Sequence, residues 1–287
     1  MYGTMYCEQN LLVEADWLEN NINDPGLVVV DCDDGDVWNT REHIPKSVVI
    51  PGHHYVKHPN FTEDRAAFPL VPSPEDFSCL MDRMGISNDT KVIAYDGSGS
   101  LYAARFWWAL SYFGHENVKV LNGGWVKWLA EGRPSQKNTF RRNLDEIGPG
   151  KFISKVNSGI GCSLAEGISY LDNQDIIFLD VRSEEEWAGV NDRGNIRSGH
   201  VPGAVHLEWT NFLTPDKYRT IKPTLELERM LNQAGVTPDK RIVTYCQGGV
   251  RAALVFFVLT LLGFENVRNY DGSMGEWANR MNTPLVK

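Results

Sequence analysis

A cysteine stands between a short apolar strand and a glycine loop in the stretch Ile242 to Ala253, which reads Ile-Val-Thr-Tyr-Cys-Gln-Gly-Gly-Val-Arg-Ala-Ala. The β-branched and aromatic residues before Cys246 predict a strand, the two glycines predict a loop, and the apolar residues from Arg251 onward predict a helix. Backbone N–H groups and a helix start would then converge on the sulfur, which favours the thiolate over the thiol. The stretch therefore predicts a nucleophilic cysteine in an anion-binding loop.

The loop itself is short and rich in glycine, and it consists of Gln247, Gly248, Gly249 and Val250. Because glycine has no Cβ, such a backbone can wrap closely around a bound centre and stabilise a sulfur anion or an oxyanion without a metal. A helix start alone contributes roughly 0.3–1 kcal/mol to such stabilisation. We therefore expect the guanidinium groups of Arg182 and Arg251 to stand near the sulfur as well.

The elements that position this loop occur twice in the chain. Five blocks recur in the same order roughly 150 residues apart, far beyond the 20–50 residues of solenoid repeats. The pairs are Leu27–Asp31 with Ile176–Asp180, His43–Ile50 with His200–Leu207, Val92–Asp96 with Ile242–Cys246, Gly114–Val118 with Gly263–Val267, and Asn122–Trp128 with Asp271–Trp277. We infer a duplicated domain, with a first copy over 8–135, a linker over 136–155 and a second copy over 156–287.

Apolar strands that alternate with helices predict an α/β fold with mainly parallel sheets and helices on both faces. Ligands bind such sheets outside the carboxyl ends of the strands, where Cys246 and the Asp180-Val181-Arg182 segment both lie. The first copy has Asp96 in place of Cys246, a loop one residue longer, and no arginine at the position of Arg251. The first copy is therefore interpreted as a scaffold or as one wall of an interdomain cleft.

Composition excludes several classes of function. A formal net charge of -9 argues against general nucleic-acid binding. Five cysteines without a CxxC pair suggest neither a zinc site nor a disulfide framework, and their odd number fits a reducing compartment. The first residues do not resemble a signal peptide, and the longest apolar run, 252–262, is well short of the ~20 residues that a membrane span requires. We expect a cytoplasmic protein that binds no membrane.

The remaining cysteines and two paired histidines receive structural interpretations. His43 and His200 precede similar proline turns in both copies, so they are interpreted as turn residues, which disfavours a Cys–His hydrolase. The other cysteines lack the loop setting of Cys246 and are interpreted as structural or incidental; they are Cys7, Cys32, Cys79 and Cys162.

These motifs resemble the tandem-domain rhodaneses, the thiosulfate and 3-mercaptopyruvate sulfurtransferases, over nearly the whole chain. The resemblance is carried by Asp180–Arg182, Gly199–Ala204, Cys246–Arg251, Asp271–Trp277 and, in the first copy, Tyr95–Gly99 and Asn122–Trp125. It implies two tandem rhodanese-like domains, each a mainly parallel sheet flanked by helices on both faces, the first without a catalytic cysteine. Asp96 fits that pattern.

The resemblance also implies a two-step sulfur transfer without a cofactor or metal. Cys246 would take the sulfane sulfur of a small anionic donor as a persulfide, and cyanide, a thiol, thioredoxin or a protein cysteine would accept it. The loop from Gln247 to Val250 would cradle the persulfide. Arg182, Arg251 and Arg193 would be substrate-binding candidates, with Asp180 in support.

Departures from the family pattern bear on the donor. Many mercaptopyruvate enzymes have Gly-Ser or Gly-Thr after the cysteine, where this chain has Gln247 and Gly248. Glu186 stands where animal enzymes often have a second arginine, and the run Asp180–Trp187 resembles bacterial thiosulfate sulfurtransferases. We therefore expect thiosulfate as the donor, with 3-mercaptopyruvate as the alternative.

Two rival functions use similar residues. Related phosphatases have a Cys-X5-Arg loop, whereas four residues separate Cys246 from Arg251 here. The shorter loop makes a tighter cradle that suits one sulfur atom, which disfavours a phosphatase or an arsenate reductase. A non-enzymatic persulfide carrier or signalling module would use the same residues and remains an alternative.

Overall fold

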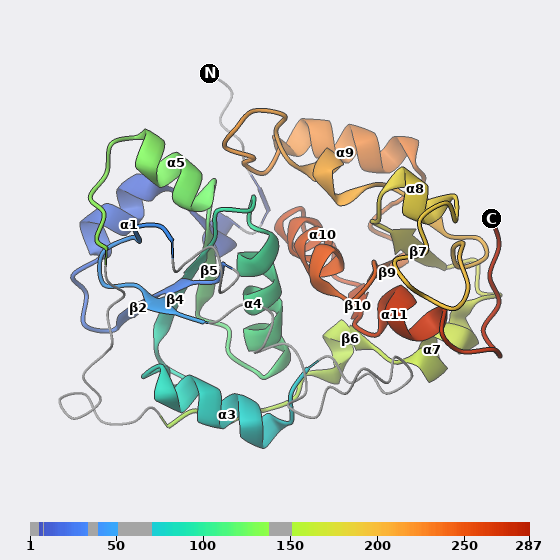
Figure 1. Cartoon of the computed structure of the whole chain (residues 1–287), viewed down its shortest axis with the longest axis horizontal. Helices are drawn as coiled ribbons and strands as arrows, with labels where there is room; N and C mark the ends of the chain where they lie inside the picture. Colours follow the sequence, from blue (N-terminus) through green and yellow to red (C-terminus); the bar gives the residue numbers. More distant parts are fainter. Residues whose placement is uncertain (1–5, 8, 34–39, 51–70, 138–150) are drawn as a thin grey trace.

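The chain folds into two α/β domains that lie side by side (Figure 1). The computed structural model describes residues 6–7, 9–33, 40–50, 71–137 and 151–287. Within these residues each domain contains a five-stranded sheet, with strand orders β1-β5-β4-β2-β3 and β6-β10-β9-β7-β8. All the strand pairs within the two sheets are parallel, and the two orders correspond strand by strand, which confirms the predicted fold and the duplication.

The described elements alternate between strand and helix as expected. The first domain contains η1 (Gln9–Leu11), β1 (Leu12–Val13), α1 (Ala15–Asn21), β2 (Leu27–Asp31), β3 (Val48–Val49), α3 (Pro74–Arg83), β4 (Lys91–Tyr95), α4 (Leu101–Tyr112), β5 (Val118–Leu121) and α5 (Gly124–Ala130). The second contains η3 (Ser158–Ile160), β6 (Gly161–Cys162), α7 (Leu164–Tyr170), β7 (Ile176–Asp180), α8 (Glu184–Trp187), β8 (Val205–His206), η4 (Trp209–Phe212), α9 (Thr224–Gln233), β9 (Arg241–Tyr245), α10 (Val250–Leu261), β10 (Val267–Tyr270) and α11 (Ser273–Trp277).

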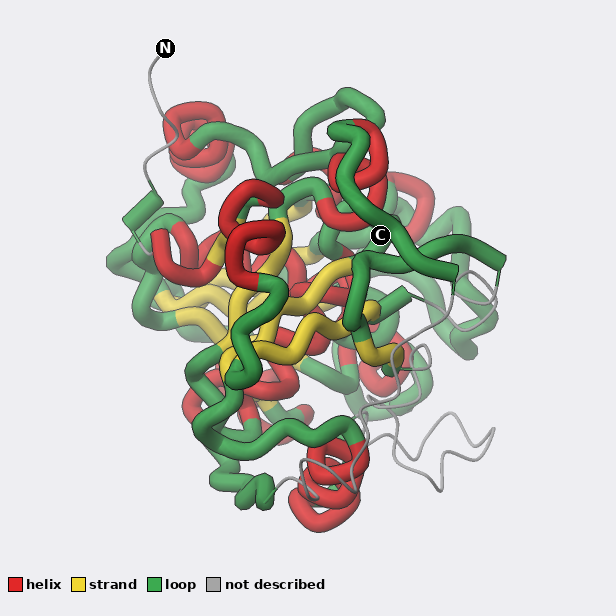
Figure 2. Tube along the Cα trace, turned by 90° about the vertical axis from the view of Figure 1, so that its left-hand side faces the viewer, coloured by secondary structure: helices red, strands yellow, loops and turns green. Residues whose placement is uncertain are grey.

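The strands lie between layers of helices, as Figure 2 shows. Alternate residues of a strand therefore face opposite helix layers. Val28 and Val30 of β2 point into one core with α3 and α4, whereas Leu27 and Val29 point into another with α1 and α5. In the second domain, Phe178 of β7 packs in the core that contains Trp277 of α11. Both faces of each sheet are therefore covered, which explains the continuous apolar runs.

The two domains share one hydrophobic core through α4 and α10, which lie next to each other at the centre of Figure 1. The Trp107 ring of α4 is 4.9 Å from the ring of Phe257 and 6.2 Å from that of Phe256 on α10. Both helices start directly after the loops that carry Asp96 and Cys246. The interdomain contact therefore lies beside the loop with the predicted nucleophile.

The pairing of β7 with β9 brings the predicted site residues together. Asp180 lies opposite Tyr245 at the carboxyl ends of these strands. The Val181 N–H donates to the Tyr245 carbonyl at 3.1 Å, which extends the pairing by one residue. Cys246 and Arg182 therefore leave neighbouring strands at the same edge of the sheet.

Two helices of the first domain have clearly defined ends. The α1 helix starts at Ala15, since Val13 pairs with Leu121 in the sheet. The α3 helix ends at Arg83, with Met84 as its C-cap. Most of the predicted linker, residues 138–150, lies outside the described residues.

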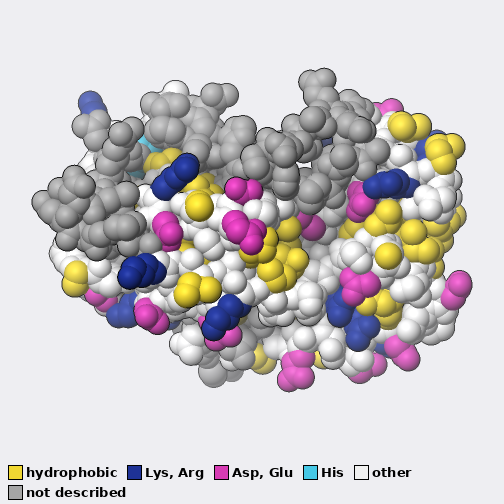
Figure 3. Space-filling model, turned by 90° about the horizontal axis from the view of Figure 1, so that it is seen from below, with side chains coloured by type: hydrophobic (Ala, Val, Ile, Leu, Met, Phe, Trp, Pro, Cys, Tyr) yellow, Lys and Arg dark blue, Asp and Glu magenta, His cyan; other side chains and the backbone are white. Residues whose placement is uncertain are grey.

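The described surface carries charges of both signs. On the face in Figure 3, basic and acidic side chains lie interspersed over the part of the chain that the structure describes. Among the described residues, none of the helices has the length and apolar character needed to cross a membrane.

Candidate functional site

Cys246 directly follows β9, the middle strand of the second sheet, at its carboxyl end. Its side chain is buried, with 1% of the residue exposed. Gln247, Gly248 and Gly249 form the loop, and α10 begins at Val250. Gly249 has a φ of +75° and caps the helix, a conformation that glycine adopts without strain. The sulfur is thus placed at the start of a 12-residue helix, as the sequence predicts.

Ser273 holds both ends of this loop. Its Oγ accepts hydrogen bonds from the N–H groups of Cys246 and Gly249, each at 3.1 Å, and donates to the Tyr270 carbonyl at 2.7 Å. The N–H of Met274 donates to the Cys246 carbonyl at 3.0 Å. The first turn of α11 therefore fixes the backbone on both sides of the thiol.

The first domain contains an equivalent loop, which follows Asp96 where the second domain has Cys246. The Asp96 carboxylate is fully buried and accepts four backbone N–H groups at 2.8–2.9 Å, those of Ser98, Ser100, Tyr102 and Ala103. Burial and the neighbouring Asp33 carboxylate raise the pKa of Asp96 to about 6, although the N–H groups act in the opposite direction. At neutral pH this loop therefore encloses an anion.

In the second domain three of the corresponding N–H groups are open. Counted from the first residues of α4 and α10, Tyr102 and Ala103 correspond to Arg251 and Ala252, and counted from Asp96 and Cys246, Ser98 corresponds to Gly248. Within the part of the chain that the structure describes, no hydrogen-bond acceptor contacts the N–H groups of Gly248, Arg251 and Ala252. We call these three N–H groups the cradle. The cradle therefore consists of N–H donors at the start of α10, on the loop that directly follows Cys246.

Arg251, which ends the loop, is paired with Glu186. The two guanidinium nitrogens donate to the two carboxylate oxygens at 2.6 and 2.9 Å, and Glu186 is 3% exposed. Burial disfavours the Glu186 carboxylate, but the hydrogen bonds and charge of Arg251 outweigh burial and lower its pKa below the ordinary value. Glu186 therefore neutralises much of the charge that Arg251 brings to the loop.

Arg182 also forms an ion pair, in this case with Asp180. Its guanidinium donates to both oxygens of Asp180 at 2.6–3.0 Å and to the Gly199 carbonyl at 2.9 Å, and the residue is 2% exposed. Asp180 thus holds the guanidinium of Arg182 in a buried pair. Donor binding by Arg182 stays a prediction, because it requires the guanidinium to reach a ligand from this buried pair.

Arg193 differs from the other two arginines in its exposure. Its side chain is 55% exposed, and its Nε lies 3.9 Å from Glu186. Arg193 is therefore the most accessible of the three predicted substrate-binding cations. Arg197, in contrast, donates to backbone carbonyls of the C-terminal segment, including Thr283 at 2.7 Å, and serves to hold that segment.

Gln247 connects the loop to the segment after α8. Its amide exchanges two hydrogen bonds with Asn195, both at 3.0 Å, and Asn279 donates to the same Asn195 oxygen. This pair keeps the 191–199 segment, including Arg193, next to the loop. The side chain of Gln247 therefore organises the surroundings of the site, while its backbone belongs to the loop.

His43, His200 and Cys162 lie in structural settings. His43 and His200 each form an isolated antiparallel bridge with the end of their own domain, at Gln136 and Val286. Their Nδ1 atoms contact Asp31 at 2.8 Å and the Trp187 carbonyl at 3.0 Å. Burial, followed by the charge of Glu166, raises the pKa of the Cys162 thiol to about 12, which opposes thiolate formation there.

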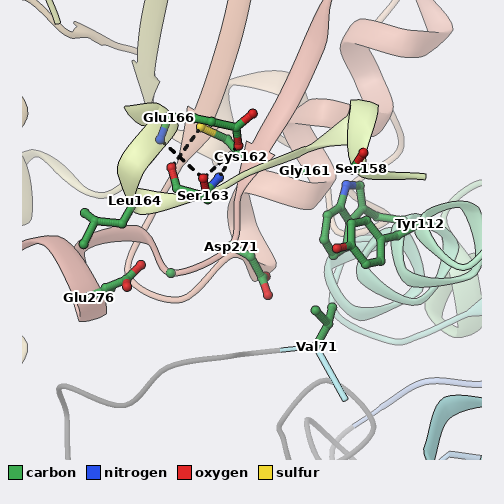
Figure 4. Close-up of a pocket in the computed structure, with 12 residues that line it drawn as sticks. Val71, Tyr112, Ser158, Gly161, Cys162, Ser163, Leu164, Glu166, Asp271 and Glu276 are labelled. Carbon is green, nitrogen blue, oxygen red and sulfur yellow. Dashed lines mark hydrogen bonds between the residues drawn. The ribbon is translucent and has the colours of Figure 1, made fainter. Parts of the chain in front are cut away.

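A cavity of about 360 Å³ lies between the domains next to this site (Figure 4). It is lined by Trp108 and Tyr112 of α4 and, from the second domain, by Cys162, Glu166, Asp271 and Glu276, among others. Cys246 is not among its lining residues. Two of the lining residues, Asp271 and Gly272, directly precede Ser273 in the chain, and they connect the cavity to the site.

Three residues next to the loop were not predicted from the sequence, namely Ser273, Asn195 and Asn279. Ser273 could have been found in the repeat, because it stands where the first copy has Gly124. A Cβ at Gly124 would lie 2.0 Å from the Asp96 carbonyl, so only the second domain can place a hydroxyl there. The other residues reach the loop through side-chain contacts that sequence spacing does not show.

The comparisons with known proteins agree with this geometry. The family model of the Rhodanese-like domain matches residues 14–131 and 163–280, which lie inside the predicted domains. The chain is 33% identical to a thiosulfate sulfurtransferase of Corynebacterium glutamicum, covering 98% of this chain and 91% of the relative. It is 32% identical to the sulfur carrier protein TtuD of Thermus thermophilus, covering 98% of each chain.

The structural comparison gives the same result. The crystal structure of SseA from Escherichia coli, a 3-mercaptopyruvate sulfotransferase with the rhodanese fold, superposes with a TM-score of 0.78 at 27% identity. The match covers 92% of this chain and 98% of that protein. Both domains and their relative arrangement are therefore shared over nearly the full length.

Proposed function

Because the chain belongs to the rhodanese family, we propose that it transfers sulfane sulfur from a small anionic donor to a thiophilic acceptor through a persulfide on Cys246. The cradle in front of Cys246 is the observation that supports this most directly. The corresponding N–H groups of the first domain bind the Asp96 carboxylate, which supports an anion-binding role for the cradle. In the second domain the anion would be the terminal sulfur of the persulfide.

Each step balances without a cofactor. The Cys246 thiolate attacks the outer sulfur of thiosulfate, a sulfur–sulfur bond forms, and the donor bond breaks so that sulfite leaves with the electron pair. An acceptor such as cyanide then attacks the outer sulfur of the persulfide. This second step releases thiocyanate and restores the thiolate. In both steps the cradle donates hydrogen bonds to the sulfur that carries negative charge, which lowers the barrier.

Thiosulfate is the donor that we propose. The exposed guanidinium of Arg193 would make the first contact with the dianion, since Arg251 is paired with Glu186. The likeness to thiosulfate sulfurtransferases supports this choice. 3-Mercaptopyruvate is the second candidate, because a protein that acts on it shares the fold at 27% identity.

A comparison of the two donors with cyanide as the common acceptor tests the proposal. We expect the purified protein to gain the mass of one sulfur atom on incubation with thiosulfate and to lose it when cyanide is added. Cys246→Ser should remove both the mass gain and the turnover. Cys162→Ser is the matched control, because this buried thiol of the same domain is held in the protonated form, and it should keep both.

The outcomes separate the alternatives. Turnover that is faster with 3-mercaptopyruvate than with thiosulfate would reassign the donor. A stable persulfide that cyanide does not discharge would instead indicate a sulfur carrier, as the name of the Thermus thermophilus relative suggests. Hydrolysis of an aryl phosphate that depends on Cys246 would contradict sulfur transfer as the function.

A further inference from the structure

An arginine of the first domain reaches the catalytic loop of the second. Arg105 lies on α4 and is 1% exposed. Its Nη1 donates to the Gly249 carbonyl at 3.4 Å, and its Nη2 lies 2.6 Å from Oδ1 of Asp271. Because Gly249 is the last loop residue before α10, this contact connects the domain without a catalytic cysteine to the backbone around Cys246.

Gly249 is enclosed by this ion pair. A Cβ at Gly249 would lie 2.4 Å from Oδ1 of Asp271 and 3.0 Å from Nη1 of Arg105. Its carbonyl also accepts from Asn269 at 3.2 Å, and its N–H donates to Ser273. The second domain therefore supplies the contacts of Asn269, Ser273 and Asp271, and Arg105 completes the set from the other side of the interface.

Packing of the two helices does not require an arginine at this position. Arg105 is the fifth residue of α4, and the fifth residue of α10 is Leu254, which is equally buried. A buried guanidinium carries a large desolvation penalty unless it is paired. Here Asp271 supplies the pairing charge, and the Trp108 ring lies 4.5 Å from the guanidinium carbon. The asymmetry between the two helices thus occurs where α4 meets the loop of Cys246.

We propose that Arg105 is a positioning residue for sulfur transfer, which acts by holding Gly249 so that the cradle N–H groups point at the sulfur. The inference rests on the proposed function of Cys246. It gives the first domain a part in catalysis although that domain has Asp96 in place of the cysteine. Asp271 serves as the partner that holds the guanidinium in place.

The test compares Arg105→Met, which keeps the length of the side chain without its charge, with Arg105→Lys, which keeps the charge. We expect Arg105→Met to slow single-turnover persulfide formation from thiosulfate by about 10- to 100-fold, since small misplacements of reacting groups have effects of this size. The donor KM should change less than about twofold, because the arginine does not contact the donor. Arg105→Lys should restore part of the rate.

A control variant separates positioning from general loss of the interface. Tyr6 donates from its hydroxyl to the Lys222 carbonyl of the other domain at 2.9 Å, away from the loop, so Tyr6→Phe should keep the wild-type rate. If Arg105→Met does not fold, Asp271→Asn breaks the same pair and should slow the reaction in the same way. Wild-type rates in folded Arg105→Met, or in Asp271→Asn, would overturn the proposal.

A readout that is independent of sulfur transfer distinguishes failure of this inference from failure of the proposed function. Alkylation of Cys246 by iodoacetamide at fixed pH reports the reactivity of the thiol itself. We expect Arg105→Met to slow alkylation by about tenfold, because a displaced cradle stabilises the thiolate less. If the wild type formed no persulfide while alkylation still slowed in Arg105→Met, the function would be wrong and the positioning role would stand. Equal alkylation rates would refute the positioning role.

Discussion

Replacement of Ser273 by alanine should destabilise the protein and impair the site at the same time. The Ser273 hydroxyl accepts from the N–H groups of Cys246 and Gly249. Without it, two buried N–H groups lose their acceptor, at about 1–3 kcal/mol each. We therefore expect Ser273→Ala to lower the free energy of unfolding by about 2–6 kcal/mol. The rate of persulfide formation should also fall, because both ends of the loop are released.

Ser273→Gly refines the test. Ser273 has a φ of +49°, a conformation that costs a residue with a Cβ roughly 1–2 kcal/mol and costs glycine almost nothing. The glycine variant loses the same hydrogen bonds but relieves this strain. It should therefore be more stable than Ser273→Ala and less stable than the wild type.

Urea denaturation and single-turnover kinetics measure both effects. Ser111→Ala is the matched control, because its hydroxyl donates only within α4, to the Trp107 carbonyl at 3.0 Å. We expect that control to stay within about 0.5 kcal/mol of the wild type. If Ser273→Ala were as stable and as fast as Ser111→Ala, the assigned role of the hydroxyl would be refuted.

Three further predictions concern the charged groups. Asp96→Ala should lower the free energy of unfolding in urea by at least about 3 kcal/mol, since four N–H groups lose their acceptor; a smaller loss than in Ser111→Ala would contradict this. The pKa of Glu186 is lowered by Arg251, so the pair should stabilise the protein at neutral pH and lose its effect as the pH falls through that lowered pKa. Glu186→Gln should accordingly flatten the acid side of the plot of melting temperature against pH, and an unchanged profile would count against the pair. Arg193→Ala should raise the thiosulfate KM about two- to fivefold with little change in kcat, as expected for an exposed charge; a fall in kcat alone would exclude donor capture.

Much of the fold could be predicted because its signals are local. The buried runs Leu27–Asp31 and Ile176–Asp180 are apolar along their whole length, as strands covered on both faces must be. Local signals are also present in α3, which has Ser73 as its N-cap and Pro74 as its first residue. Because the domain is duplicated, each strand or helix predicted in one copy could be compared with the aligned segment of the other.

The position of the Cys246 loop could also be predicted, because a parallel sheet presents its ligand site at the carboxyl ends of strands. Cys246 lies at that edge, beside the Asp180–Arg182 segment, as expected. The repeat also showed that the two loops differ in chemistry, since aligned positions hold the Asp96 carboxylate in the first copy and the Cys246 thiol in the second. The sequence therefore predicted the edge of the sheet at which this loop lies, whereas the nucleophilic role of Cys246 stays a prediction.

The sequence by itself determined the α/β architecture, its duplication and the loop around Cys246, since these depend on residues that are near each other in the chain. Only the tertiary structure decided which charged side chains pair with each other. The sequence predicts that the arginines lie at the carboxyl ends of the strands, but it does not show which groups they contact. Arg182 binds Asp180, Arg251 binds Glu186, and Arg105 crosses from the other domain to Gly249. Side chains distant in sequence meet only when the domains pack, and that packing sets how much positive charge is left for a donor.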